Sequence, residues 1–187
     1  MKRIVDRSKW VSPNEYAKWA ELGRAYTKMM LSDGPSNQGI HPILWAKNVI
    51  SRQSYSDDET DYRRPGTSGT GEAASIHDAA LRTKTGNCTE HASVAFTYLY
   101  RLGIRPLVML GYSAGLDNHM LVAVGLDLDA YNFAQYNSDY PNWKKEIHVD
   151  KSWICDPWKN TTYLAAPNFY AFEPNAKGII QIRAWAV

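Results

Sequence analysis

At residues 86–92 the chain reads Gly86-Asn87-Cys88-Thr89-Glu90-His91-Ala92, and this stretch opens a helical pattern. Gly103 supplies a C-terminal stop after apolar residues that recur at helical spacing, namely Ala92, Ala95, Leu99 and Leu102. A thiol in the first turn of a helix lies at the positive end of the macrodipole, which favours a thiolate. The backbone N–H groups around Asn87 and Cys88 are then candidate donors to an oxyanion. Gly86 allows a tight turn and the close approach of a substrate backbone.

Four apolar segments after this helix predict β-strands, and they run over Pro106–Tyr112, Met120–Leu126, Ile147–Cys155 and Ile179–Val187. A central helix followed by short strands is typical of an α+β fold, in which the helix packs on an antiparallel sheet.

The first half of the chain predicts additional helices. Ser12-Pro13-Asn14-Glu15 has the pattern of a capping box with proline at the first helical position. The amphipathic run that follows stops at Ser32-Asp33-Gly34-Pro35, and a second helix is expected from Ile43 to Arg52. The polar stretch from Tyr55 to Gly71 predicts a long exposed loop. We therefore expect a single domain, 1–187, with an N-terminal helical region (1–54), an exposed loop (55–75) and a core (76–187).

The composition limits the class of protein. The chain has 187 residues, of which 44% are hydrophobic, enough for one core. A net charge of +2 is too weak to indicate nucleic acid or an anionic membrane as the partner. No run approaches the roughly 20 apolar residues of a membrane span. The start, Met-Lys-Arg-Ile-Val-Asp-Arg, has no apolar stretch behind it, so we expect no cleaved signal peptide. Two cysteines are too few for a disulfide framework, which favours a chain made in a reducing cytosol.

A histidine and an aspartate complete the pattern of a thiol nucleophile. His119 begins the strand after a polar loop, and a base at the mouth of a strand is held rigidly. Asp156 ends the next apolar run, directly before Pro157. If these two strands pair antiparallel, the start of one lies beside the end of the other, and the carboxylate lies next to the imidazole. Cys88, His119 and Asp156 would then be the attacker, the base and the group that orients the base.

Three segments together are similar to a known family. They are Gly86–Ala92 with Tyr98–Pro106, Asn118-His119-Met120-Leu121-Val122-Ala123-Val124, and Trp153-Ile154-Cys155-Asp156-Pro157-Trp158. Over residues 80 to 160 the chain resembles the transglutaminase-like, papain-related cysteine enzymes. The resemblance implies a papain-like/transglutaminase-like core and the same three roles for Cys88, His119 and Asp156. The Asn-Cys-x-Glu-His-Ala and Cys-Asp-Pro-Trp details are similar to small bacterial toxin and effector members, several of which deamidate glutamine in host proteins. The family's side-chain oxyanion donor, a Gln or Trp before the cysteine, has no clear counterpart here.

The resemblance implies a cysteine-dependent acyl-transfer enzyme with no cofactor, and glutamine deamidation of a protein is the expected reaction. Cysteine protease or amidase activity, including peptidoglycan cleavage, and transglutamination are alternatives, because all of them share the same thioester. The expected partner is a protein substrate in a host or competitor cell, together with an immunity protein or chaperone if the protein is a toxin. Such a protein would be made in the bacterial cytoplasm and then secreted or injected into a target cell.

Two alternatives belong to other classes. One is a non-catalytic binding module that keeps the shape of the triad. The other is a zinc-stabilised domain in which Cys88 and His91 join His119 and Cys155, although no second closely spaced ligand pair supports a metal. Otherwise His91 is expected to be a polar residue hydrogen-bonded near the helix, and Cys155 a core thiol, since side chains alternate along a strand. The candidates for a substrate groove are Gly86, Glu90, Asn118 and Trp158.

Overall fold

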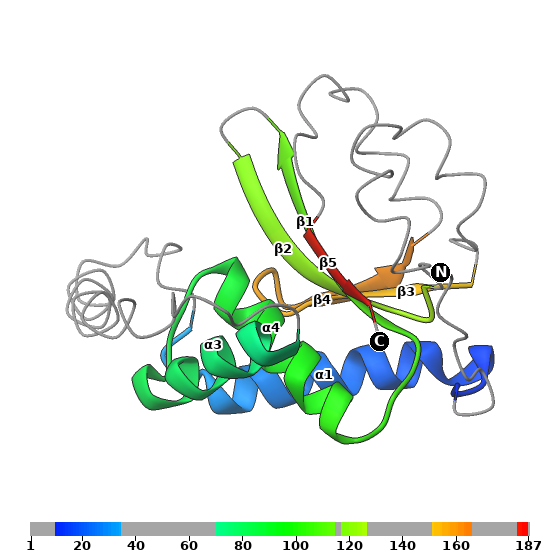
Figure 1. The fold of residues 1–187 in the computed structure, drawn as a ribbon, viewed down its shortest axis with the longest axis horizontal. Helices are drawn as coiled ribbons and strands as arrows, with labels where there is room; N and C mark the ends of the chain where they lie inside the picture. The colour runs from blue at the N-terminus through cyan, green and yellow to red at the C-terminus, as the bar shows by residue number, and fades with distance from the viewer. Residues whose placement is uncertain (1–9, 35–69, 115–116, 127–150, 166–182, 187) are drawn as a thin grey trace.

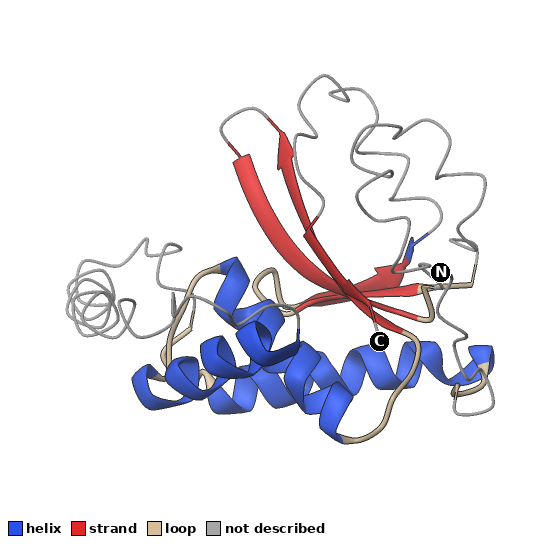
Figure 2. Ribbon diagram, viewed as in Figure 1, coloured by secondary structure: helices blue, strands red, loops and turns tan. Residues whose placement is uncertain are grey.

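A computed structural model describes residues 10–34, 70–114, 117–126, 151–165 and 183–186. These residues form two layers, an antiparallel sheet and a group of helices that lies together on one side of it (Figure 1). Figure 2 shows the same separation of helices from strands. The helices are η2 (Pro13–Glu15), α1 (Tyr16–Met30), α3 (Thr70–Thr83) and α4 (Cys88–Arg101). The predicted α+β class is confirmed. None of the described helices is long and apolar enough to cross a membrane.

The sheet is antiparallel at every pairing of its described strands, which are β1 (Leu107–Ala114), β2 (Asp117–Val124), β3 (Trp153–Asp156), β4 (Thr161–Leu164) and β5 (Arg183–Ala186). Their order is β4-β3-β2-β1-β5. Strands β1 and β2 form a hairpin whose register runs from Leu107↔Val124 to Ala114↔Asp117. Strand β2 also pairs with β3, through Val122↔Cys155. This second pairing brings the predicted base and carboxylate together.

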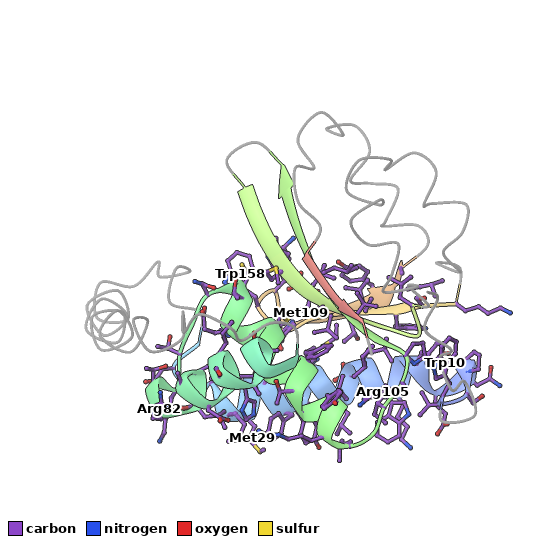
Figure 3. All side chains as sticks on the ribbon, viewed as in Figure 1. Trp10, Met29, Arg82, Arg105, Met109 and Trp158 are labelled. Atoms are coloured by element: carbon purple, nitrogen blue, oxygen red, sulfur yellow. The ribbon has the colours of Figure 1, made fainter. Side chains whose placement is uncertain are left out.

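Helix α4 lies at the centre of the core because one of its faces is apolar at helical spacing. Phe96 and Leu99 are almost completely buried, and each contributes roughly 2 kcal/mol by burial. Met109 of β1 lies between the sheet and the helices (Figure 3), where its Sδ accepts a hydrogen bond from Ser93 Oγ at 3.8 Å. The helix ends at Arg101 and Gly103 follows with a φ of 79°, so the predicted C-terminal stop is confirmed.

Helix α1 packs against α4, β3 and β4. Its proline start is confirmed, but the predicted capping box is wrong. The first turn winds as a 3-10 helix, so the Glu15 N–H donates to the backbone carbonyl of Ser12 at 2.9 Å and the Ser12 side chain makes no capping bond. The helix ends at Met30 as expected, and Gly34 follows with a φ of 73°.

Helix α3 corrects the predicted loop. It begins at Thr70 and Ala73 is fully buried, so residues 70–75 of the loop predicted at 55–75 are helical. Ala73, Ile76 and Ala80 are buried at positions i, i+3 and i+7, a helical spacing that the surrounding glycine, serine and threonine residues obscure. The helix predicted at Ile43–Arg52 and the loop at 55–69 lie outside the described residues. The same holds for residues 147–150 of the third predicted strand and for residues 179–182 and 187 of the fourth.

The turn after β2 provides a test of the packing between the sheet and α1. Gly125 has a φ of 88°, and a Cβ there would lie 2.2 Å from two ring carbons of Tyr16, whose ring is buried. We expect Gly125→Ala to lower the free energy of unfolding by about 3 kcal/mol or more, because backbone strain and a ring clash add. Gly103→Ala is the control, since its φ is also positive but nothing lies within 4 Å. Urea denaturation of both variants measures the difference, and equal losses would contradict the contact with Tyr16.

Candidate functional site

Cys88 is the first residue of α4, and the residue before it makes both bonds of a capping box. The Asn87 Oδ1 accepts a hydrogen bond from the Thr89 N–H at 2.8 Å, and the Asn87 N–H donates to Glu90 Oε2 at 2.7 Å. Such caps satisfy N–H groups at the helix start and fix the path by which the chain enters the helix. The partly exposed Cys88 thiol is therefore carried by a well-defined helix start.

The cap changes the predicted roles of three neighbours. Glu90 is only 3% exposed and its carboxylate accepts the capping bond, which gives this groove candidate a structural role at the helix start. A Cβ on Gly86 would lie 2.3 Å from the Cβ of Glu90, so the absence of a side chain at Gly86 permits the close approach of Glu90. The Asn87 backbone N–H is committed to Glu90. Of the two predicted donors to an oxyanion, the backbone N–H of Cys88 is therefore the one that we retain as a candidate.

His119 of β2 and Asp156 of β3 are hydrogen-bonded, as the antiparallel pairing of their strands predicted. His119 Nε2 lies 2.8 Å from Asp156 Oδ2. One step beyond the Val122↔Cys155 pair, Asp156 stands opposite Leu121, and His119 is the next residue on that side of β2. His119 is 6% exposed and Asp156 is 0% exposed. Because water competes little for either group, this contact is stronger than one between exposed side chains.

The other carboxylate oxygen of Asp156 is also held in place. The Lys159 backbone N–H donates to Oδ1 at 3.1 Å, and the turn closes where the Asn160 N–H meets the Pro157 carbonyl at 3.2 Å. The Asn160 side chain in turn accepts a hydrogen bond from Arg24 of α1. The carboxylate is thus fixed by its own turn, and the turn is tied to the helical layer.

These supporting contacts differ in how well local sequence patterns indicate them. The Asp-Pro pair at residue 156 marks a turn, and aspartate often bonds to the backbone that follows it, so the contact to Lys159 was open to prediction. Arg24 and Asn160 are 136 residues apart in the chain. No local pattern indicates that pair, since only the packing of α1 against β3 and β4 brings it together.

His119 hydrogen-bonds to Cys88 as well, so one ring joins the thiol to the carboxylate. Asp156 accepts the Nε2 side of this bridge. Burial by itself would lower the pKa of His119, but hydrogen bonds and charges from Asp156 and Cys88 outweigh burial and raise that pKa to about 9. The imidazolium form therefore predominates near neutral pH, directly beside the candidate nucleophile.

Two further groove candidates lie next to His119. The Trp158 ring is tilted by 56° to the His119 ring, with the centroids 5.1 Å apart. In Figure 3 Trp158 lies above the helical layer, at the side of the molecule where α4 begins. Its half-buried indole thus covers part of the His119 ring, while its role in a substrate groove stays a prediction. Asn118 precedes His119 in β2 and its backbone pairs with Ser113, while its side chain is outside the described part of the structure.

The two other residues considered in the sequence, His91 and Cys155, are buried and make structural contacts. His91 is 3% exposed and its Nδ1 lies 2.9 Å from the Asn87 carbonyl oxygen, which confirms a polar residue hydrogen-bonded near the helix. Burial lowers the pKa of His91. Cys155 is fully buried in the core between β3 and α1, as predicted, and burial raises the pKa of its thiol. Within the described ranges, no three His, Cys, Asp or Glu side chains are grouped so as to hold a metal ion.

Comparison of the chain with models of known protein families, with curated proteins and with solved structures finds no match. What can be concluded about the site therefore comes from its own residues and their geometry.

Proposed function

We propose that this protein is a cysteine-dependent acyl-transfer enzyme and that it deamidates glutamine in a protein substrate. The observation that supports this most directly is the single imidazole of His119, hydrogen-bonded both to Cys88 and to Asp156. The triad comes from the start of α4, from β2 and from the end of β3. A partly exposed thiol, a base and a buried carboxylate in this order are what a nucleophile of this kind requires.

The same arrangement supports a papain-like/transglutaminase-like core as part of the proposal. The thiol stands at the N-terminal end of a central helix, and the other two residues come from adjacent antiparallel strands. The motif resemblance covers the same three segments. A target in a host or competitor cell, and delivery there by secretion or injection, belong to this proposal through that resemblance.

In the proposed reaction the Cys88 sulfur, as the thiolate, attacks the carbon of a glutamine carboxamide. The carbonyl oxygen becomes an oxyanion in the tetrahedral intermediate, and the Cys88 backbone N–H is the candidate donor to it. The intermediate collapses, the C–N bond breaks, and the imidazolium of His119 gives its proton to the departing ammonia. Water then attacks the thioester while His119 takes up a proton, releasing glutamate and restoring the thiol. Asp156 holds the ring and stabilises its charged form throughout.

Peptidase, amidase and transglutaminase reactions would use the same thioester, so only the products separate them from deamidation. Intact-mass spectrometry of a candidate protein substrate makes the distinction. Deamidation adds about one dalton per site as NH₂ is replaced by OH, proteolysis gives fragments, and transglutamination gives the mass of an added amine. If only fragments are found, the protein is a peptidase and not a glutamine deamidase. If only amine adducts are found, it is a transglutaminase.

Thiol labelling tests the proposed nucleophile without a known substrate. We expect iodoacetamide at pH 6.5 to alkylate Cys88 at least about 10-fold faster than glutathione, because the partly exposed sulfur stands at the start of a helix and beside the imidazole of His119. Cys155 should react only after unfolding, since it is fully buried. Peptide mapping by mass spectrometry reads both thiols in one sample.

The other two classes of function predict different labelling. A non-catalytic binding module has no reason for an activated thiol, and slow labelling of Cys88 would favour it. A zinc-stabilised domain would label only after a chelator is added, with about one zinc per chain by elemental analysis.

A further inference from the structure

The backbone carbonyl of Asn87 accepts two hydrogen bonds from the same residue. One is the helical bond from the His91 N–H at 3.1 Å, and the other comes from the His91 ring, whose Nδ1 lies 2.9 Å from the oxygen. A helix start needs only the first of these bonds. The ring therefore adds a second donor to the peptide group that links Asn87 to Cys88.

Both sides of Asn87 are fixed in this way. Its N–H is held by Glu90 and its C=O is held by His91, so two successive residues of α4 hold the backbone that precedes the nucleophile. In a trans peptide group the C=O and the N–H of the next residue lie in one plane and point in opposite directions. Fixing the Asn87 carbonyl therefore also fixes the direction of the Cys88 N–H.

The form of the His91 ring suits this role. A carbonyl oxygen can only accept, so the Nδ1 must carry the proton. Burial lowers the pKa of His91, and the hydrogen bond to Asn87 and the nearby charge of Asp156 only partly offset burial, so the ring is neutral at pH 7 with its single proton on Nδ1. At 3% exposure, water does not readily replace the donor if the ring is removed.

We propose that His91 is a positioning residue, which directs the Cys88 backbone N–H toward the oxyanion by holding the Asn87 carbonyl. The proposal rests on the acyl-transfer function above. Two bonds to the carbonyl also polarise the peptide group, which makes its N–H a better donor. His91 acts through the Asn87–Cys88 peptide and has no part in proton transfer, which belongs to His119.

Two chemical probes separate this role from general damage to the site. Acylation of Cys88 by p-nitrophenyl acetate passes through a tetrahedral oxyanion, whereas alkylation by iodoacetamide forms no oxyanion. We expect His91→Leu to slow acylation by about 10- to 100-fold and to leave alkylation within about 2-fold of wild type. His91→Asn should restore most of the acylation rate, because its amide nitrogen can take the place of Nδ1.

His77→Leu is the matched control. His77 is a histidine of α3 that is 2% exposed and bonded to the adjacent Asp78, so its removal also deletes a buried imidazole. It should leave the ratio of the acylation rate to the alkylation rate unchanged, and melting curves check that each variant is folded.

The outcomes distinguish this inference from the proposed function. If wild-type Cys88 reacts with neither probe, the acyl-transfer function itself fails. If wild type reacts with both and His91→Leu keeps the wild-type ratio, the positioning role fails while the nucleophile stands. An equal fall in acylation and alkylation would assign His91 a purely structural role and also overturn the inference. If His91→Leu does not fold, the ratio of the acylation rate to the alkylation rate is measured in His91→Asn instead. A ratio near that of wild type supports the positioning role, and a ratio lower by 10-fold or more contradicts it.

Discussion

The Cys88→Ala variant is expected to lose acyl transfer almost completely while keeping the wild-type fold. Removing the nucleophile of a triad enzyme lowers kcat by about six orders of magnitude. The substitution should cost little stability, because the side chain is partly exposed and the capping bonds of the helix start come from Asn87 and Glu90. Turnover of p-nitrophenyl acetate, corrected for the reaction of the ester with other groups, measures the loss, and circular dichroism measures the fold.

Cys155→Ala is the control for this experiment, since it removes the other thiol of the chain. That change should lower the melting temperature by leaving a small core cavity, but it should not abolish turnover. A folded Cys88→Ala protein with wild-type turnover would overturn the proposed function. Loss of turnover in Cys155→Ala at a temperature where it is folded would show that the wrong cysteine was assigned.

The second large effect is expected for Asp156→Asn, with a fall in kcat of about 10³- to 10⁴-fold. The side chains are nearly the same size, so packing should survive. However, an amide can present an N–H donor where the Nε2 proton of His119 needs an acceptor. The turn closed by Lys159 can still bond to the amide oxygen. The loss should therefore be chemical rather than structural.

The pH dependence of this variant gives an independent test. The pKa of His119 is raised to about 9, and Asp156 is a main cause of the rise. Activity needs the imidazolium to protonate the leaving group, so in wild type it should fall as the pH rises through about 9. This fall in activity at high pH is the upper limb of the pH profile. In Asp156→Asn the upper limb should move to lower pH, because the carboxylate that helps to raise the pKa of His119 is gone.

Stability should follow the same titration. The pKa of His119 is about 9 in the folded protein and about 6.5 in the unfolded chain, so protonation of His119 stabilises the fold. This contribution is complete below about pH 6.5 and is lost as the pH rises through about 9. The melting temperature of wild type should therefore exceed that of Asp156→Asn most at pH 6.5, and the difference should narrow above pH 9.

Asp78→Asn is the matched control, because Asp78 bonds to a histidine on α3. It should keep wild-type kcat and the wild-type upper limb. Normal turnover and an unmoved upper limb in Asp156→Asn would show that Asp156 only starts a turn before Pro157.

Much of the described fold was open to prediction because it follows local patterns. The helix from Cys88 and its end near Gly103 follow from apolar spacing and from a glycine that takes a positive φ. The strands at Leu107 and Met120 follow from continuous apolar runs, but β2 begins at Asp117, because its polar residues 117–119 pair with β1. The helix at Thr70 was missed because its small residues resemble a loop, and only their burial against the neighbouring helices shows the pattern. The capping box at Ser12 was wrongly predicted because the same residues also permit a 3-10 turn.

The sequence by itself indicated which residues belong to the candidate triad, since Cys88 opens a helical pattern and Asp156 ends an apolar run, while His119 lies next to another apolar run. The structure starts that strand two residues earlier than predicted, at Asp117, so His119 is its third residue. Only the tertiary structure decided how the three triad residues meet. The β2–β3 register brings the carboxylate to Nε2 of the histidine, and the packing of the helices against the sheet brings the thiol to the same ring. It also showed that Glu90 and Gly86 contact each other and Asn87 at the start of α4. The physical reason is that spacing fixes periodicity and caps within one element, whereas distances between elements depend on packing that no local pattern contains.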